Sequence, residues 1–249
     1  TDRSGSDVFP TLFLSGCHFA SNGANVGGGV SASGSSVLSL QESVFSGNTA
    51  AFGGGLATSD VSQANGLSLV FEKNTATYAG ALLIHSNQSS TFDSCSFTFN
   101  IGTVSGGAVG VSGNSSSVFS GCQITYNGAG QQGGGMDITA ESAVELWNVE
   151  IANNTATNGG GLSIRDSARP TLFGCSFTGN AASSLGGGVI VGQRATPSFT
   201  DCLFEWNLAD AGGGVRTEDL SNTTFTSCTL RRNTAYQGGG GNVSSNSTW

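Results

Sequence analysis

The chain has 249 residues, of which 40 are glycine, and only 10% are charged, against about 25% in ordinary globular domains. Its net charge is −8, with Lys73 as the single lysine, so it lacks the basic surface that binds nucleic acids or anionic lipids. No apolar run reaches the roughly 18 residues that span a bilayer, so we expect no direct membrane insertion.

An asparagine recurs along the whole chain with a sequence period of 26 or 27. The members of this series, called the ladder asparagines below, are Asn22, Asn48, Asn74, Asn100, Asn127, Asn154, Asn180, Asn207 and Asn233. A fixed period of this length is the signature of a repeat architecture.

The other positions of each repeat keep the same period. Eight residues before the asparagine stand Leu14, Leu40, Phe92, Phe119, Leu146, Leu172, Phe199 and Phe225, with Gly66 as the exception. Three residues before it stand Phe19, Phe45, Phe71, Phe97, Ile124, Ile151, Phe177, Phe204 and Leu230. Five or six residues after it comes a triplet of glycines, or of glycine and alanine, and then an apolar–x–apolar stretch. These short alternations predict strands with one buried face.

A repeat of this length with three short strands and three turns is one coil of a parallel β-helix. We therefore predict an all-β, right-handed parallel β-helix of about nine coils, forming one domain over residues 1–249. At a strand spacing of about 4.8 Å the rod would be roughly 40 Å long. Because the pattern runs from residue 12 to Val243, we expect a segment of a longer rod or copies that stack end to end into a fibre.

Both repeated polar features are predicted to be structural. The asparagine amides would bond the amides above and below, and the asparagine itself would take a left-handed backbone at a corner. The glycine triplets would relieve crowding at a second corner. A nucleotide-binding loop would occur once, whereas these triplets occur in every coil.

Six cysteines lie five residues before a ladder asparagine, at Cys17, Cys95, Cys122, Cys175, Cys202 and Cys228. Their position has the parity of the buried column, so we expect inward-pointing, free thiols. The alternative is a disulfide between vertical neighbours, but stacked Cβ atoms about 4.8 Å apart exceed the 3.5–4.5 Å that a disulfide prefers. Zinc is disfavoured, because no histidine shares the column and no Cys-x-x-Cys occurs.

A paired motif, Phe-x-x-Asn followed by Gly-Gly-Gly/Ala and an aliphatic residue, recurs at 45–48 with 53–56, at 97–100 with 106–109, and at 177–180 with 186–189. It resembles the repeat of the chlamydial polymorphic outer membrane proteins. The resemblance covers almost the whole chain and implies a right-handed β-helix passenger that is displayed at a cell surface and used in adhesion. The membrane β-barrel of that family is missing from this sequence.

The sequence shows no constellation typical of catalysis. His18 and His85 fall in different coils and columns, so they form neither a metal pair nor a triad. Glu205 and Arg231 are vertical neighbours, which indicates a surface ion pair. We predict no catalytic residue, no cofactor and no metal.

Charged residues are densest around the strand connection that follows the glycine corner. Asp137 and Arg216 share the outward column beside the glycine corner but lie three coils, roughly 14 Å, apart. The charged residues around the connection are Arg165, Asp166, Arg169, Arg194, Arg216, Glu218 and Asp219. Mixed signs favour a solvated rim, with a glycan-binding or catalytic groove as the alternative.

We therefore predict an extracellular structural or adhesive protein, displayed on a cell surface or assembled into a filament. Its partners would be other copies or further coils of the same chain, and a host receptor or glycan. The alternatives are a polysaccharide-binding or polysaccharide-cleaving β-helix and an ice-binding protein. Ice binding is disfavoured because the column two residues before the asparagine has threonine only at Thr98, Thr125 and Thr178.

Six Asn-x-Ser/Thr sequons are candidate N-glycosylation sites. They are Asn87, Asn114, Asn153, Asn222, Asn242 and Asn246. Their number is close to chance expectation for this composition. Three of them, Asn87, Asn114 and Asn222, fall in the outward connections between strands.

Overall fold

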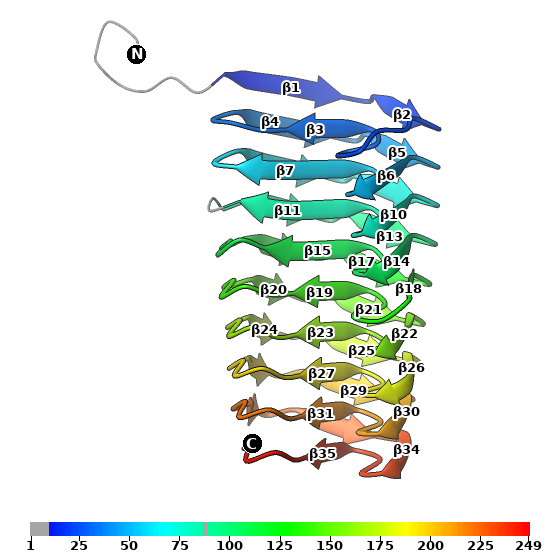
Figure 1. Ribbon diagram of the computed structural model, residues 1–249, viewed down its shortest axis with the longest axis vertical. Helices are drawn as coiled ribbons and strands as arrows, with labels where there is room; N and C mark the ends of the chain where they lie inside the picture. The colour runs from blue at the N-terminus through cyan, green and yellow to red at the C-terminus, as the bar shows by residue number, and fades with distance from the viewer. Residues whose placement is uncertain (1–9, 87–88) are drawn as a thin grey trace, which may run out of the picture.

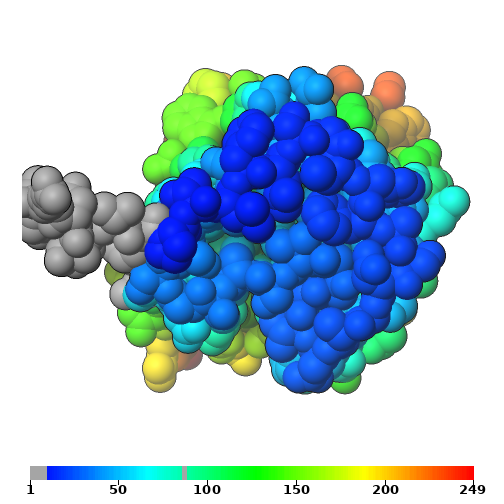
Figure 2. Space-filling model, turned by 90° about the horizontal axis from the view of Figure 1, so that it is seen from above, coloured from blue at the N-terminus to red at the C-terminus, as the bar shows by residue number. Residues whose placement is uncertain are grey.

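The structure is a computed structural model that describes residues 10–86 and 89–249. Within these ranges the chain forms strands and turns and winds into a rod, with the coils stacked as layers from one end to the other (Figure 1). Seen along the rod, successive coils lie beneath one another, so the lower coils show mainly around the rim (Figure 2). No helix in the described ranges is long and apolar enough to cross a membrane.

The coils wind through four parallel sheets, numbered 1 to 4 in the order in which the chain visits them, and the first described coil has strands only in sheets 1, 2 and 4. Sheet 1 contains β1 (Thr11–Ser15), β4 (Val37–Gln41), β8 (Gln63–Leu67), β12 (Thr91–Asp93), β16 (Val118–Ser120), β20 (Glu145–Trp147), β24 (Thr171–Phe173), β28 (Ser198–Thr200) and β32 (Thr224–Thr226). Sheet 2 contains β2 (His18–Ala20), β5 (Val44–Ser46), β9 (Val70–Glu72), β13 (Ser96–Thr98), β17 (Gln123–Thr125), β21 (Glu150–Ala152), β25 (Ser176–Thr178), β29 (Leu203–Glu205) and β33 (Thr229–Arg231).

Sheets 3 and 4 complete the coil. Sheet 3 contains β6 (Thr49–Phe52), β10 (Thr75–Tyr78), β14 (Ile101–Ser105), β18 (Gly128–Ala129), β22 (Thr155–Asn158), β26 (Ala181–Leu185), β30 (Leu208–Ala211) and β34 (Thr234–Gln237). Sheet 4 contains β3 (Val30–Ala32), β7 (Leu56–Asp60), β11 (Leu82–Ser86), β15 (Val109–Ser112), β19 (Met136–Ile138), β23 (Leu162–Ile164), β27 (Val189–Val191), β31 (Val215–Thr217) and β35 (Gly241–Val243).

The predicted all-β parallel solenoid of about nine coils is confirmed, with one addition. The repeat predicted three strands per coil, and the structure has a fourth, sheet 3, between the asparagine and the glycine triplet. This segment is rich in Thr, Ala and Gly, and its buried positions are small residues such as Ala76, Ala182 and Ala209, so it lacks the large buried side chains that mark the other strands. It becomes a strand because its backbone pairs with its counterparts above and below, as Thr75 does with Thr49 and Ile101.

The interior consists of stacked columns of identical positions. Phe45 and Phe71 stack with ring centroids 4.6 Å apart and an interplanar angle of 8°, and Phe71 and Phe97 stack at 4.8 Å and 4°. All three rings are fully buried. The exception in the neighbouring column, Gly66, has a local cause: a Cβ there would lie 2.6 Å from Cδ1 of Leu69, which fills the space.

The ladder asparagines line the corner between sheets 2 and 3, and those between the two ends of the rod are buried. Asn74 Oδ1 accepts two hydrogen bonds from Asn48, from its backbone N–H at 2.9 Å and from Nδ2 at 3.0 Å. Asn74 Nδ2 donates to the Phe45 carbonyl at 2.9 Å and to Asn100 Oδ1 at 3.0 Å. At every step of the ladder, the side-chain oxygen of one asparagine accepts these two hydrogen bonds from the asparagine of the preceding coil. The buried amides are therefore fully paired.

The left-handed backbone lies one residue before each ladder asparagine, so the expectation that the asparagine itself is left-handed was wrong. The left-handed residues, with φ from 55 to 67°, are Ser21, Gly47, Lys73, Phe99, Tyr126, Asn153, Gly179, Trp206 and Arg232. The ladder asparagine must aim its backbone N–H along the rod at the next amide oxygen, so the chain turns at the preceding residue instead.

The glycine triplet forms the corner between sheets 3 and 4, where successive coils approach closely. A Cβ at Gly54 would lie 2.8 Å from the Thr75 carbonyl oxygen, and one at Gly55 would lie 2.9 Å from Cδ1 of Phe71. Both separations are shorter than a side chain tolerates, which explains why the smallest residues recur at this corner.

The shorter and the longer coils differ only in sheet 3. The spacing from the first residue of a triplet to the next ladder asparagine is 21 in every coil, whereas the spacing from asparagine to triplet is five or six. The extra residue shifts the pairing of β10 with β14 between Ala76 and Tyr78, and similar shifts occur between β22 and β26 and between β26 and β30. Sheets 1, 2 and 4 therefore keep their register.

The six cysteines are free thiols at the turn between sheets 1 and 2. Four are buried, and the two nearest the rod ends, Cys17 and Cys228, are half-buried. Each sulfhydryl donates to a backbone carbonyl, as Cys122 does to the Ser120 oxygen at 3.4 Å.

The four buried cysteines form two hydrogen-bonded pairs whose members shift in opposite directions: the hydrogen bond with Cys95 lowers the pKa of Cys122, and the hydrogen bond with Cys202 lowers the pKa of Cys175. A hydrogen bond with Cys122, and then burial, raise the pKa of Cys95 above its usual value. A hydrogen bond with Cys175, and then burial, raise the pKa of Cys202. Protonated, shielded thiols of this kind behave as small apolar core residues.

Replacing Asn127 by alanine should lower the free energy of unfolding by about 3 kcal/mol or more. The change leaves the Asn100 backbone N–H, the Asn100 Nδ2 and the Phe97 carbonyl without these partners in a buried site, and each unmet group costs about 1–3 kcal/mol. Denaturant unfolding measures the loss. Asn22→Ala is the control, because Asn22 is exposed and its replacement removes only the hydrogen bond from Asn22 Nδ2 to Asn48. An equal loss of stability in both variants would contradict the ladder's role.

Iodoacetamide should modify Cys17 and Cys228 in the folded protein long before the four buried cysteines, because alkylation requires an accessible thiolate. Peptide mass spectrometry of protein treated before and after unfolding in guanidinium gives the order. Modification of Cys95 in the native protein at the rate seen after unfolding would show that the column is open to solvent.

Candidate functional site

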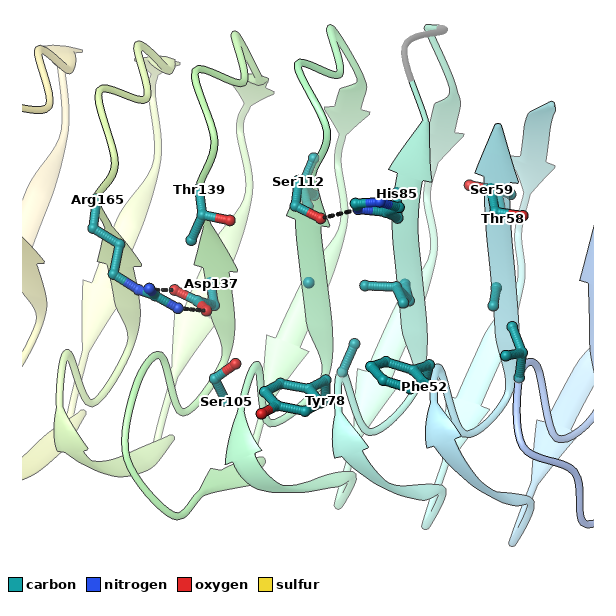
Figure 3. Close-up of a pocket in the computed structure, with 16 residues that line it drawn as sticks. Phe52, Thr58, Ser59, Tyr78, His85, Ser105, Ser112, Asp137, Thr139 and Arg165 are labelled. Carbon is teal, nitrogen blue, oxygen red and sulfur yellow. Dashed lines mark hydrogen bonds and ion pairs between the residues drawn. The ribbon is translucent and has the colours of Figure 1, made fainter. Parts of the chain in front are cut away.

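A groove runs along the rod on the outer face of sheet 4, with a volume of about 380 Å³ (Figure 3). It crosses β7, β11 and β15 and reaches β19. The face is concave because side chains at the ends of the sheet 3 strands project outward along one side. Side chains at or near the ends of the sheet 4 strands project outward along the other side. Its long direction is therefore the direction in which the coils stack.

The floor of the groove is one column of outward residues. Leu83 pairs in register with Ala57 above and Gly110 below, and Gly110 pairs with Asp137. The period places these residues outside the core, as predicted, yet Ala57 is fully buried because the walls shield it. A Cβ at Gly110 would lie 3.0 Å from that of Ala79, so the floor is closely packed as well as apolar.

One wall is aromatic. Phe52 and Tyr78 are the last residues of β6 and β10, just before the glycine corner, and their rings stack at 5.5 Å and 9°. Their exposed fractions are 39% and 40%, so each ring keeps a free surface over the floor. Ser105 takes this position in the next coil, where the first extra residue of sheet 3 occurs, and the aromatic wall ends there.

The opposite wall is polar. It consists of the aligned residues Ser59, His85, Ser112 and Thr139, which Figure 3 shows along the edge facing the aromatic rings. Nδ1 of His85 lies 2.8 Å from Oγ of Ser112, within hydrogen-bond distance. This wall offers hydroxyl and imidazole groups that both donate and accept hydrogen bonds.

An ion pair closes the far end of the groove. Arg165 donates to both carboxylate oxygens of Asp137, from Nη2 at 2.8 Å and from Nε at 3.3 Å. The Asp137 side chain is 6% exposed. Burial disfavours the charged form of Arg165, but the adjacent Asp137 carboxylate more than offsets this and raises the pKa of Arg165. Arg165 also donates to Asp166 at 3.3 Å, so its guanidinium bridges two carboxylates, and its contact with Asp137 is bidentate.

The charges singled out in the sequence do not converge on one site. Asp137 pairs with Arg165 and not with Arg216, which instead donates to Glu218 at 3.1 Å. His85 lines the groove, whereas His18 is exposed on β2 in sheet 2. In the parts of the chain that the structure describes, no three metal-binding side chains come together.

The predicted vertical pair of Glu205 and Arg231 is present, with the charged atoms 3.0 Å apart, and Arg232 joins it at 3.1 Å. The hydrogen bond and charge of Arg231, together with Arg232, lower the pKa of Glu205. This cluster lies on the surface of sheet 2, away from the groove.

Most sequon asparagines are on the surface. Asn114, Asn153, Asn222 and Asn246 are exposed. Asn242 is half-buried and accepts a hydrogen bond from Arg216. Asn87 lies outside the described residues.

The aromatic wall was missed at the sequence level. Its signal is the one-coil spacing that links Val26, Phe52 and Tyr78, three large side chains directly before the triplet. Phe52 and Tyr78 fall in sheet 3, which the pattern of buried positions did not reveal as a strand, and Val26 forms an isolated bridge with Phe52.

Comparison with known proteins identifies the architecture. The sequence model of the family described as right handed beta helix region matches residues 80–248. No curated protein and no solved structure matches the chain. The family match supports the β-helix part of the resemblance to the chlamydial surface proteins and says nothing specific of their repeat. The chain belongs to the right-handed β-helix family.

Proposed function

We propose that this protein is an extracellular adhesive β-helix that binds an uncharged glycan chain in the groove over sheet 4 and does not cleave it. The observation that carries the proposal is the pairing of the two walls: stacked Phe52 and Tyr78 face a row of hydroxyl and imidazole groups across an apolar floor.

The chemistry of the walls fits a sugar chain. A pyranose ring has an apolar C–H face that packs on aromatic rings and a rim of hydroxyls that need hydrogen-bond partners. Binding sites are typically apolar with a few well-placed polar groups, as here. The groove spans several coils at about 4.8 Å each, so it offers room for more than one sugar unit. The Arg165 guanidinium is engaged by the carboxylates of Asp137 and Asp166, so it is not free to bind an anionic ligand, which favours an uncharged one.

Binding is favoured over cleavage because of the carboxylates. Glycoside hydrolysis uses two carboxyl groups that flank the scissile bond. Among the described residues that line the groove, Asp137 is the single carboxylate, and both of its oxygens are engaged by Arg165. A carboxylate so tied down is a poor acid, base or nucleophile.

The rest of the surface supports an adhesive role outside the cell. Ser, Thr, Asn and Gln make up most of the polar exterior, and the net charge of −8 disfavours nucleic acid as a ligand. The resemblance to chlamydial surface adhesins points in the same direction. An ice-binding role receives no support, because the column of Thr98, Thr125 and Thr178 is interrupted by other residue types.

Isothermal titration calorimetry against uncharged hexasaccharides of glucose, mannose, xylose and N-acetylglucosamine tests the proposal. At least one should bind, and the double variant Phe52→Ala/Tyr78→Ala should weaken binding by about tenfold or more, which corresponds to ~1.4 kcal/mol. The reason is loss of the ring faces on which the sugars pack.

The matched control is Phe99→Ala/Tyr126→Ala, which removes another exposed, stacked aromatic pair, with centroids 5.4 Å apart. This variant should bind like the parent. Equal binding by the groove variant and the parent, with the fold intact by thermal unfolding, would refute the proposal. Release of reducing ends or unsaturated products from a bound oligosaccharide would show instead that the groove is catalytic.

A further inference from the structure

A second surface feature, distinct from the groove, follows the corner between sheets 2 and 3. It is the column of left-handed residues that precede the ladder asparagines, called the ridge here. In chain order its members are Ser21, Gly47, Lys73, Phe99, Tyr126, Asn153, Gly179, Trp206 and Arg232. All stand at the outer edge of the rod, opposite the buried ladder.

Three ridge residues combine two unfavourable properties. Phe99, Tyr126 and Trp206 are bulky residues with φ near 56 to 59°, where glycine is preferred, and their exposed fractions are 55%, 54% and 57%. Gly47 and Gly179 show that the same position accepts glycine. These rings leave apolar surface in water, which a covering group would bury.

The sequon Asn153-Asn154-Thr155 lies on the ridge between these aromatic residues. Asn154 is the ladder residue and is buried, whereas Asn153 and Thr155 are both exposed. The backbone N–H of Asn153 is held by the Thr178 carbonyl at 3.0 Å, so its position is fixed. Among the described residues, the Asn153 side-chain amide has no hydrogen-bond partner.

The Asn153 side chain points along the ridge toward the next coils. A Cβ built on Gly179 would lie 2.7 Å from Asn153 Oδ1, and beyond the Asn153 side chain and the chain neighbours of Gly179 no heavy atom lies within 4 Å of that point. Gly179 therefore forms a notch in the ridge. One coil further stands Trp206, two coils and roughly 10 Å from Asn153. The guanidinium of Arg232, on the far side, lies 5.1 Å from the Trp206 ring centroid.

We propose that Asn153 is N-glycosylated and that the first N-acetylglucosamine packs in the notch over Gly179, against the Trp206 ring. The bond forms between Asn153 Nδ2 and C1 of the sugar as the C1–O bond to a lipid-linked pyrophosphate oligosaccharide breaks. Nδ2 loses one proton, and the lipid pyrophosphate leaves. The attached sugar covers an aromatic face that the protein leaves in water.

The other sequons within residues 10–86 and 89–249 lack this arrangement. Asn222 already accepts a hydrogen bond from the Thr248 hydroxyl at 2.7 Å, and Asn242 accepts one from Arg216. Asn114 and Asn246 are exposed in the turns that follow sheet 4 strands, away from the ridge. The last two serve as internal comparisons for the test.

The test of occupancy uses the full chain secreted from a eukaryotic cell. Glycopeptide mass spectrometry after amidase release in ¹⁸O-water should show Asn153 occupied, and Asn153→Gln and Thr155→Ala should each abolish that signal, whereas Thr155→Ser should retain it. An unoccupied Asn153 overturns the proposal, whether or not Asn114 or Asn246 carries a glycan.

The packing of the first sugar has its own test. Trimming the glycan to one N-acetylglucosamine should leave Tm unchanged, and complete removal should lower it by about 3 °C. In Trp206→Ala, the trimmed protein and the fully deglycosylated protein should have the same Tm. A drop of equal size in Trp206→Ala and in the parent overturns the contact with the indole. Phe99→Ala, elsewhere on the ridge, should keep the drop seen in the parent.

Discussion

Each ladder asparagine is bonded to the coil on either side of it, and these bonds fix both the spacing and the register of the rod. The Oδ1 atom of Asn74 receives two donors from the coil above, while its Nδ2 reaches a carbonyl above and an oxygen below. The amides are buried, so water cannot replace a lost partner. A one-residue slip in any coil would break the ladder on both sides, and this keeps the apolar columns inside.

Stacking in register also explains why the surface carries linear features. A side chain that points outward in one coil has its counterpart directly above and below, so grooves and ridges run along the rod. The floor from Ala57 to Asp137 and the aromatic wall of Phe52 and Tyr78 are two such lines. The corner glycines bring sheets 3 and 4 close together, so that the rings of Phe52 and Tyr78 lie beside the floor residues of the groove. A ligand that repeats along its length suits a surface built this way.

The interior of the protein could be predicted from the sequence, because buried positions must stack on like positions and the regular period makes them visible. Phe45 on Phe71 is an example. The groove could be predicted only in part. Its floor follows from the period, but the bond from Arg165 back to Asp137 depends on the direction of a long side chain. Sheet 3 escaped prediction because its buried positions are small residues such as Ala76 and Ala209, not the large apolar side chains that mark the other three sheets.

Sheet 3 also determines where the length of a coil can change. All variation in coil length is absorbed there, by the register shifts beside Ala76 and Ala156 and in β26, while the length of chain that passes through the other three sheets stays constant. Insertions at this seam leave the hydrophobic interior and the amide ladder undisturbed. Sheet 3 is therefore the place where an engineer could graft a peptide beside the groove without altering the winding of the rod.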